Sequence, residues 1–249
     1  MGMRRITTLP RLGLPEVPEV GWHRTTRAEA PRPRRRIDDR FILLHLQAGL
    51  QFRACNGTNH LLSAGQGLII RPGWPHGTGH TPLTRGTAWW LHLRRPQAGQ
   101  SFLGLTLRET RAVIQGLEAP AHPVVTPAPG LADAFSDLVQ AVDRADGGLR
   151  RLALRRSVLA IVAAFAEAGT SVRARKTDTR IADLLLGAVA DPVAFRHPAA
   201  LAVRAGCSLS RLRARVKEAT GMALGDWLLR ARIDRAMRDL IDHPRRSIT

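Results

Sequence analysis

The spacing of apolar residues changes near residue 98, and this change limits what the chain can fold into. Between residues 41 and 93, short apolar runs are broken by turn residues, as in FILLHLQAGLQFRA around Gly49. The Asn56-Gly57 pair that follows is a strong signal for a two-residue hairpin. Several short strands at close spacing are typical of a small β-sandwich or β-barrel. We expect such a unit in the N-terminal half, preceded by a Pro- and Arg-rich loose arm over residues 1–36.

Beyond residue 98 the apolar residues recur with the period of an α-helix. The stretch LADAFSDLVQAVDRA, which begins at Leu131, carries one apolar stripe. The next stretch, LRRLALRRSVLAIVAAFAEA, is apolar on more than one side, so its second side should be buried against another element or a second subunit. SVRARKTDTR is charged and polar, as linkers are, and from Ile181 onward the pattern predicts short helices. The expected fold class is therefore α+β.

The chain of 249 residues carries a formal net charge of +18. All but two of its 38 basic residues are arginines, and nucleotide bias in a genome also produces such a composition. A strongly basic protein nevertheless attracts polyanions, and nucleic acid is the first candidate. The cysteines Cys55 and Cys207 form neither a disulfide framework nor a zinc set, which fits a reducing cytoplasm. No apolar run approaches a membrane span, and no signal peptide is expected.

Residues 198–221 are typical of a helix, a tight turn and a second helix. Pro198 suits a first helical position, and Gly206 suits the turn. Ser208 is a good N-cap for the second helix, and Gly221 ends it. On a helical wheel the apolar residues of the second helix form one face, and its basic residues form two rows beside that face. The core face is Leu209, Leu212, Val216 and Ala219; the rows are Arg211 with Arg215 and Arg213 with Lys217; Ser210, Ala214 and Glu218 lie between the rows.

Two basic edges around a face of small residues suit a helix in the major groove of DNA. The basic edges can reach phosphates or guanine edges while the small residues allow close approach. The alternative is an ordinary amphipathic helix with solvated arginines. The glycine turn and the serine cap favour the helix-turn-helix interpretation.

The stretch LAVRAGCSLSRLRARVKEATGMALGDWLLRARIDRAMRDLI resembles the first half of an AraC/XylS-type DNA-binding domain. The matching positions are Ala202, Gly206, Ser208, Leu212, Val216-Lys217, Thr220-Gly221, Trp227, Arg232 and Ala236. Val216 replaces the usual Phe and Trp227 the usual Tyr, while Ala214 stands where many members carry a base-reading Arg. The resemblance therefore assigns base contacts to Arg213 and Ser210, and phosphate contacts to the other basic residues of this helix. They are Arg211, Arg215 and Lys217.

Members of that family continue into a second helix-turn-helix, and this chain ends at Thr249, where that unit would begin. The resemblance thus implies a truncated DNA-binding domain. With one reading helix, non-specific binding to DNA should survive and most of the operator preference should be lost.

The N-terminal half resembles the cupin-like sensor domain of the same family, through GLIIRPGWPHGTG and the following WWLHL. The implied organisation is a flexible arm over 1–36, a cupin-like ligand-sensing β domain over 37–98, a helical coupling and dimerisation segment over 99–170, and a DNA-binding domain over 178–249. Cupin metal sites need a His-x-His pair and a Glu on an earlier strand. This chain offers only His76 at the matching turn, so we expect no metal, no cofactor and no enzyme activity.

A β domain that encloses a small polar organic ligand is more plausible. The candidate contacts offer positive charge, flat faces and hydrogen-bond donors: Arg53, Arg71, Trp74, His76, Trp90 and His92. Alternatives remain for several of them. Trp89 and Trp90 alternate along a strand, so one of the two belongs to the core. His76 can simply fix its Pro-Gly turn, and His92 or His45 can be a structural histidine.

The resulting hypothesis is a sequence-specific transcription regulator that binds double-stranded DNA and responds to a small polar effector in the β domain. Its further expected partners are RNA polymerase and a second copy of the chain, with dimer contacts through the 131–145 helix or the helix that follows it. Two alternatives stay open. One is a cupin-type enzyme with a basic helical appendage. The other is a ligand-independent DNA-binding protein whose β domain only forms dimers.

Overall fold

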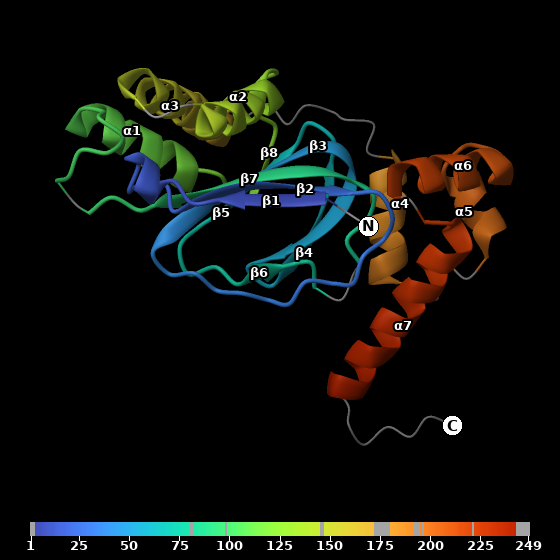
Figure 1. Cartoon of the computed structure of the whole chain (residues 1–249). Helices are drawn as coiled ribbons and strands as arrows, with labels where there is room; N and C mark the ends of the chain where they lie inside the picture. The colour runs from blue at the N-terminus through green and yellow to red at the C-terminus, as the bar shows by residue number, and fades with distance from the viewer. Residues whose placement is uncertain are drawn as a thin grey trace.

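The computed structural model describes residues 3–79, 82–97, 99–144, 147–171, 180–191, 195, 197–220 and 222–242. Their N-terminal part is an antiparallel sheet whose main strands follow the order β1-β2-β7-β3-β5-β8 (Figure 1). The strands are β1 (Met3–Thr7), β2 (Glu19–Thr25), β3 (Arg40–Cys55), β4 (Thr58–Ser63), β5 (Gly67–Ile70), β6 (His76–Gly77), β7 (Gly86–Arg94) and β8 (Val124–Val125).

Strand β3 is long enough to serve both walls of this β domain. Its first part pairs with β7 and β5, and its last residues pair with β4 and β6. A β-bulge between Leu46 and Ala48 lies just before the change of partner, and bulges bend the strand that carries them. Gly49 follows at a φ of 93°, and a Cβ atom there would lie 2.2 Å from the carbonyl oxygen of Arg85. Only glycine fits this corner, where β3 turns toward the second wall.

The hairpin predicted at Asn56-Gly57 is confirmed. Both residues have positive φ angles, 48° and 81°, and the flanking residues Cys55 and Thr58 are paired. Positive φ at both central positions is the geometry that Asn-Gly turns favour.

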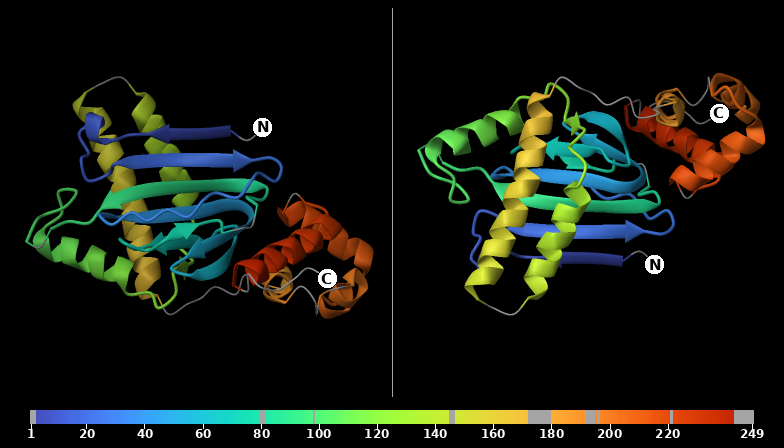
Figure 2. Two further views of the ribbon diagram at one scale, coloured as in Figure 1. Left: turned by 90° about the horizontal axis from the view of Figure 1, so that it is seen from below. Right: turned by 90° about the horizontal axis from the view of Figure 1, so that it is seen from above.

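The two faces of the sheet bury different sets of side chains. Leu43, Leu91 and Leu93 point to the face that three helices cover, whereas Leu44 and Leu68 point to the other face and belong to a separate cluster. The covering helices are α1 (Leu107–Glu118), α2 (Leu131–Asp143) and α3 (Gly148–Thr170), and both views of Figure 2 show α2 and α3 lying across the strands. The strict alternation of a strand sends neighbouring residues to opposite faces in this way.

Helix α3 was expected to be apolar on two sides, and most of its apolar surface finds partners within the chain. Val158, Ile161 and Phe165 are fully buried in the cluster that joins α2, α3 and the sheet. Leu149 and Leu152, near the beginning of the helix, stay 83% and 63% exposed. A second subunit is therefore not needed to cover residues 154–166.

The sequence indicated a loose arm over residues 1–36, and the structure differs. Strands β1 and β2 lie within that segment, and β2 pairs with β7 over its whole length. Leu9, Val17 and Val20 are buried in the helix-covered core. The apolar residues of this segment are few, so they gave no clear period, but the central strand β7 offers a free edge that β2 satisfies. The β domain consequently begins near residue 3 rather than near residue 37.

The C-terminal part is helical over all of its described elements, as the sequence predicted. The helices are α4 (Arg180–Ala190), α5 (Pro198–Arg204), α6 (Leu209–Thr220) and α7 (Leu224–Asp242), and they lie beside the β domain in Figure 1. They surround a second core that includes Leu185, Leu212 and Val216 and that β3 and β4 also reach. The α+β fold class is confirmed at this level. Across the described residues, no helix is long and apolar enough to cross a membrane.

Candidate functional site

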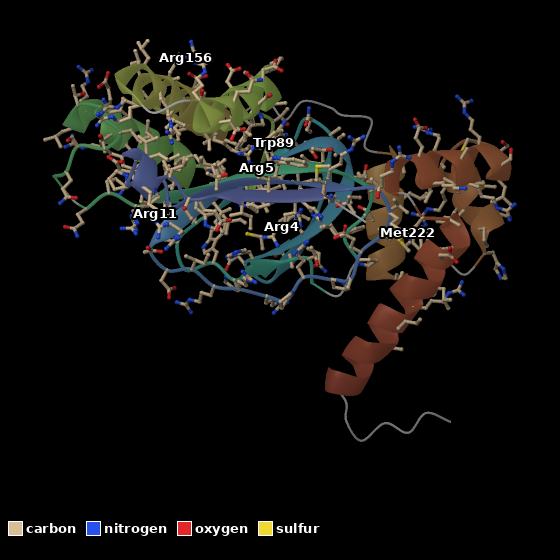
Figure 3. All side chains as sticks on the ribbon, viewed as in Figure 1. Arg4, Arg5, Arg11, Trp89, Arg156 and Met222 are labelled. Carbon is tan, nitrogen blue, oxygen red and sulfur yellow. The ribbon has the colours of Figure 1, made fainter. Side chains whose placement is uncertain are left out.

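A cavity of about 530 Å³ lies on the face of the sheet that the helices leave free. Strands β1, β2, β7 and β3 supply one wall, and the segment from Glu29 to Ile37 together with β6 closes the other. Figure 3 shows Arg4 and Trp89 on opposite sides of the sheet: Arg4 lies on the cavity side, and Trp89 lies toward α2. The polar groups that line the cavity are Arg4, Glu19, His23, Glu29, Arg32, Arg35, Arg53, His76, Thr78, Trp90 and His92.

Gly21 makes room for the indole of Trp90 in this wall. The two residues are paired across β2 and β7, and a Cβ atom at Gly21 would lie 2.4 Å from the Trp90 ring. The indole N–H of Trp90 donates a hydrogen bond of 2.7 Å to a carboxylate oxygen of Glu19, and the guanidinium of Arg4 lies over the ring at 5.4 Å. The glycine thus lets a large aromatic ring lie flat along the sheet, where it forms part of the cavity wall.

Arg53 is a half-buried cation of the cavity wall. One of its terminal nitrogens donates a hydrogen bond of 2.6 Å to the side-chain oxygen of Gln51, two residues earlier on the same face of β3. Its Nε is buried and has no hydrogen-bond partner among the described residues. Burial and, second, the nearby like charge of Arg32 lower the pKa of Arg53 to about 10. The side chain is still charged at neutral pH.

The two acidic groups of the cavity are engaged elsewhere. Glu29 lies 3.3 Å from the ring of His23 and 3.7 Å from the guanidinium of Arg32. Glu19 accepts the indole hydrogen bond of Trp90 described above. Among the described residues, neither carboxylate forms an ion pair with Arg53, whose charge is therefore not neutralised by an adjacent acid.

The histidines of the cavity are neutral at physiological pH, because burial lowers their pKa values. The pKa of His92 falls to about 4, and the pKa values of His23 and His76 are also lowered. The Nδ1 atom of His92 has no partner among the described residues, whereas Nδ1 of His76 lies 3.0 Å from the carbonyl oxygen of Trp74. Four arginines and two glutamates therefore set the charge of the cavity, which is positive.

The structure brings together four of the six ligand contacts expected from the sequence: Arg53, His76, Trp90 and His92 line the cavity. Arg71 and Trp74 lie outside it. The guanidinium of Arg71 stacks on Trp74 at 4.8 Å and donates hydrogen bonds to the carbonyl oxygens of Glu118 and Pro120. This pair ties the end of β5 to the end of α1, a structural task.

Sequence reasoning missed the cavity residues that precede residue 37. The polar ones are Arg4, Glu19, His23, Glu29, Arg32 and Arg35. The alternation of Glu19, Gly21 and His23 with more apolar neighbours was the signal that could have placed β2 beside the cavity. The alternation of Trp89 and Trp90 predicted that one of the two belongs to the core. Trp89 does, since it stacks on Phe135 of α2 at 5.7 Å, while Trp90 faces the cavity.

Helix α6 presents the residues that the wheel placed away from the core. Leu212 and Val216 are fully buried, while Ser210, Arg211, Arg213, Ala214 and Lys217 are exposed. The hydroxyl of Ser208 accepts a hydrogen bond of 3.3 Å from the backbone N–H of Arg211, which is the N-cap contact expected from the sequence. The turn before it is formed by Gly206 at a φ of 62°. Gly221 and the side chain of Ala219 lie outside the described residues.

Residues 24–159 match the family model of the AraC-like ligand binding domain. The chain belongs to this family. The match covers most of the β domain and the helices α1 and α2, with much of α3, and it confirms the resemblance that the sequence indicated for this part. No curated protein sequence matches the chain significantly.

Several solved structures are similar to parts of this AraC-like chain. The AraC-like transcriptional activator CuxR is 12% identical, with a TM-score of 0.40 over 90% of this chain and 78% of that one. A cupin protein from Bacteroides fragilis is 20% identical, with a TM-score of 0.32 over 42% and 84% of the two chains. KdgF from a Halomonas species is 13% identical, with a TM-score of 0.31 over 39% of this chain and 81% of that one.

The AraC-like domain contacts the C-terminal helices through the outer face of β3 and β4. Leu50, Phe52 and Leu61 are buried in the same cluster as α4, α6 and α7, and Phe52 stacks on Trp227 at 5.2 Å. Beside this contact a cleft of about 660 Å³ is lined by Arg24 and Arg85 of the AraC-like domain and by Arg215 and Glu218 of α6. Arg215 is half-buried there, unlike the other basic residues of α6.

The described residues of this AraC-like domain offer no cluster of metal-binding side chains. Within the described ranges, no three side chains of His, Cys, Asp or Glu converge on one point. The histidines of the cavity face arginines, and a divalent cation would meet a positive environment there. Cys55 is buried in the cavity-side cluster, and burial raises the pKa of its thiol to about 11.

Proposed function

We propose that the protein is a DNA-binding transcription regulator of the cytoplasm, controlled by a small molecule that binds in the cavity of its AraC-like domain. The family membership supports the ligand-binding half of this proposal. The exposed basic face of α6, behind a glycine turn and a serine cap, supports the DNA-binding half.

The observation that carries the proposal is the position of two neighbouring residues on β3. Arg53 lines the cavity, and Phe52 stacks on Trp227 of α7. A ligand that moves or holds Arg53 therefore acts on the same strand segment that supports the helical part. An effect of the ligand on DNA binding needs such a mechanical connection.

On DNA, α6 lies in the major groove with Ser210 and Arg213 toward base edges. Arg211 and Lys217, on the two flanks, contact phosphates. Arg215 contacts phosphate only in an arrangement that opens the cleft to the AraC-like domain, because this side chain is half-buried there. Ala214 lets the helix approach the bases closely. RNA polymerase is a further partner in this proposal.

The protein also forms homodimers in this proposal. Leu149 and Leu152 at the beginning of α3 are exposed leucines that a second copy would cover. Sedimentation velocity at tens of micromolar should give a dimer, and the double variant Leu149→Glu/Leu152→Glu should give a monomer. A clean monomer for the unmodified chain would contradict this part.

The central experiment is selection of duplexes from a randomised DNA pool, followed by titration of the selected duplex and a scrambled one. We expect an enriched sequence that the wild-type chain binds modestly more tightly than the scrambled duplex. The double variant Arg213→Ala/Lys217→Ala should lose this preference and most of the affinity. Arg108→Ala/Arg111→Ala removes the same charge from exposed positions of α1 and serves as the matched control. Equal losses in both double variants, or no enrichment, would contradict the proposal.

A further inference from the structure

We propose that the cavity takes a small organic carboxylic acid, whose carboxylate lies against the guanidinium of Arg53 and whose apolar body lies along the sheet. This inference rests on the proposed function, because it names the chemistry of the effector that the AraC-like domain binds. It comes from the side chains of the cavity, described above.

The charge of Arg53 is the first observation that points to an acid. A guanidinium with a buried nitrogen is costly unless an acid or additional hydrogen bonds compensate it. Arg53 has one neutral partner, the amide oxygen of Gln51, and its Nε has none among the described residues. Arg32 adds a like charge nearby, which makes the position of Arg53 still less favourable without a counter-ion.

The cavity itself offers Arg53 no uncommitted carboxylate among the described residues. Its two carboxylates are committed, Glu29 to His23 and Arg32, and Glu19 to Trp90. His92 offers hydrogen-bonding atoms but, like any histidine, no negative charge, and burial lowers its pKa to about 4, so that it is neutral at pH 7. A bound anion would supply the negative charge that this wall of the cavity lacks. A carboxylate matches the planar fork of an arginine, to which it can form two parallel hydrogen bonds.

The rest of the ligand would lie against an apolar wall of the cavity. The inner faces of β3 and β5 line the cavity with Ile42, Leu44, Leu68 and Ile70, and Trp90 adds a flat ring from β7. A volume of about 530 Å³ lies within the range of small-molecule sites. Bare inorganic anions would leave this apolar wall uncovered. An acid with an aromatic or cyclic aliphatic body covers it.

The experiment compares acids with their neutral amides on the full chain, by thermal denaturation and calorimetric titration. The probes are benzoate with benzamide, cyclohexanecarboxylate with its amide, inorganic phosphate and acetate as anions without an apolar body, and mannitol as a neutral polyol. We expect at least one of the two larger acids to raise Tm and to bind about tenfold or more tightly than its amide, which is the effect of one charge-assisted contact. Phosphate and acetate should bind more weakly.

The deciding variant is Arg53→Met, with Arg27→Met at an exposed position as the matched control. If the charge of Arg53 lacks a counter-ion in the ligand-free chain, Arg53→Met should leave the Tm of that chain unchanged or raise it. The increase in Tm on addition of the acid should disappear in this variant. Arg27→Met should keep the response.

Three results would overturn the inference: a lower Tm for ligand-free Arg53→Met, equal binding of acids and amides, or no response to either larger acid. Stabilisation by mannitol that persists in Arg53→Met would also overturn the inference of a carboxylic acid. It would still agree with a small-molecule effector in the cavity. The proposed function fails separately, through the DNA selection experiment, which uses no ligand.

Discussion

His45 is a buried histidine on the helix-covered face of β3, where it stacks on Phe135 at 6.4 Å. Burial lowers its pKa from 6.5 to about 4. The unfolded chain therefore binds more protons than the folded chain between these two values, and folding stability falls as the pH is lowered through this window. At pH 7 the contribution is fully present.

We expect His45→Asn to flatten the decline in unfolding free energy between pH 7 and pH 5 by about 2 kcal/mol. Urea denaturation at the two pH values measures this difference. His122→Asn, at an exposed position, should leave the decline unchanged. The same slope in both variants would show that His45 is not responsible.

Arg213 and Lys217 occupy the same flank of α6 but differ in expected role. Arg213→Ala should cost about 1–3 kcal/mol on a selected duplex and relax the preference at one base pair. Lys217→Ala should weaken binding evenly and reduce the slope of log affinity against log salt by about one. Titrations on selected and scrambled duplexes test both statements. Equal losses on the two duplexes for Arg213→Ala would assign that residue to phosphate.

At the residue scale, sequence alone predicted those cavity residues that lie on strands with a clear alternation. Arg53, Trp90 and His92 belong to this group, and His76, expected from the resemblance at the Pro-Gly turn, also lines the cavity. Arg71 and Trp74 were expected in the cavity but lie outside it. Arg71 directly follows the last residue of β5 and Trp74 lies in the turn after it, where no alternation tells which way a side chain points. Placing them needs the position of α1, which a local pattern does not contain.

Among the elements, β3 connects the cavity to the helical part. Phe52 is 2% exposed and stacks on Trp227. Truncating a buried phenylalanine typically costs about 3–5 kcal/mol, and here the loss falls on the contact between the two parts. Phe52→Ala should therefore speed amide hydrogen exchange in α6 and α7 more than in α2 and α3.

Leu229→Ala, at a 55% exposed position of α7, is the control for that experiment and should leave exchange unchanged. Equal acceleration in α2 and α3 would show that Phe52 supports the whole fold instead.

Sequence patterns predicted α2, α3 and the C-terminal helices well, because each carries a sustained helical period. They failed for β1 and β2. The first is short and carries two adjacent arginines, Arg4 and Arg5, and the second is interrupted by Gly21. β2 pairs with the edge of β7, and β1 pairs in turn with the edge of β2, so both strands answer a tertiary requirement for hydrogen-bonding partners.

Across the whole molecule, binding in the cavity and binding of DNA should be reciprocal. If a carboxylate changes DNA affinity by some factor, a saturating duplex must change the affinity for that carboxylate by the same factor. Calorimetric titration of the acid with and without a selected duplex measures this factor. In Phe52→Ala the factor should fall toward one, while binding of the acid alone persists. A factor unchanged by this substitution would place the connection elsewhere.

The change of period near residue 98 was enough to predict an α+β chain with a β domain followed by helices. How the two parts meet was not predictable. Leu50, Phe52 and Leu61 look in sequence like interior residues of a small barrel, and nothing local distinguishes a side chain that faces a barrel interior from one that faces a neighbouring helix. The interface depends on residues that are far apart in the chain.

The strict alternation along β3 also restricts how this chain can diverge. Inserting one residue between Leu50 and Phe52 would exchange the faces of all residues beyond it, so that Phe52 would enter the cavity and Arg53 would meet the helices. Both roles would fail in a single step. The bulge between Leu46 and Ala48 is different, because the extra residue there, Gln47, is already accommodated. Changes of length should therefore accumulate at the bulge, and descendants of this chain should keep the spacing from Leu50 to Arg53 fixed.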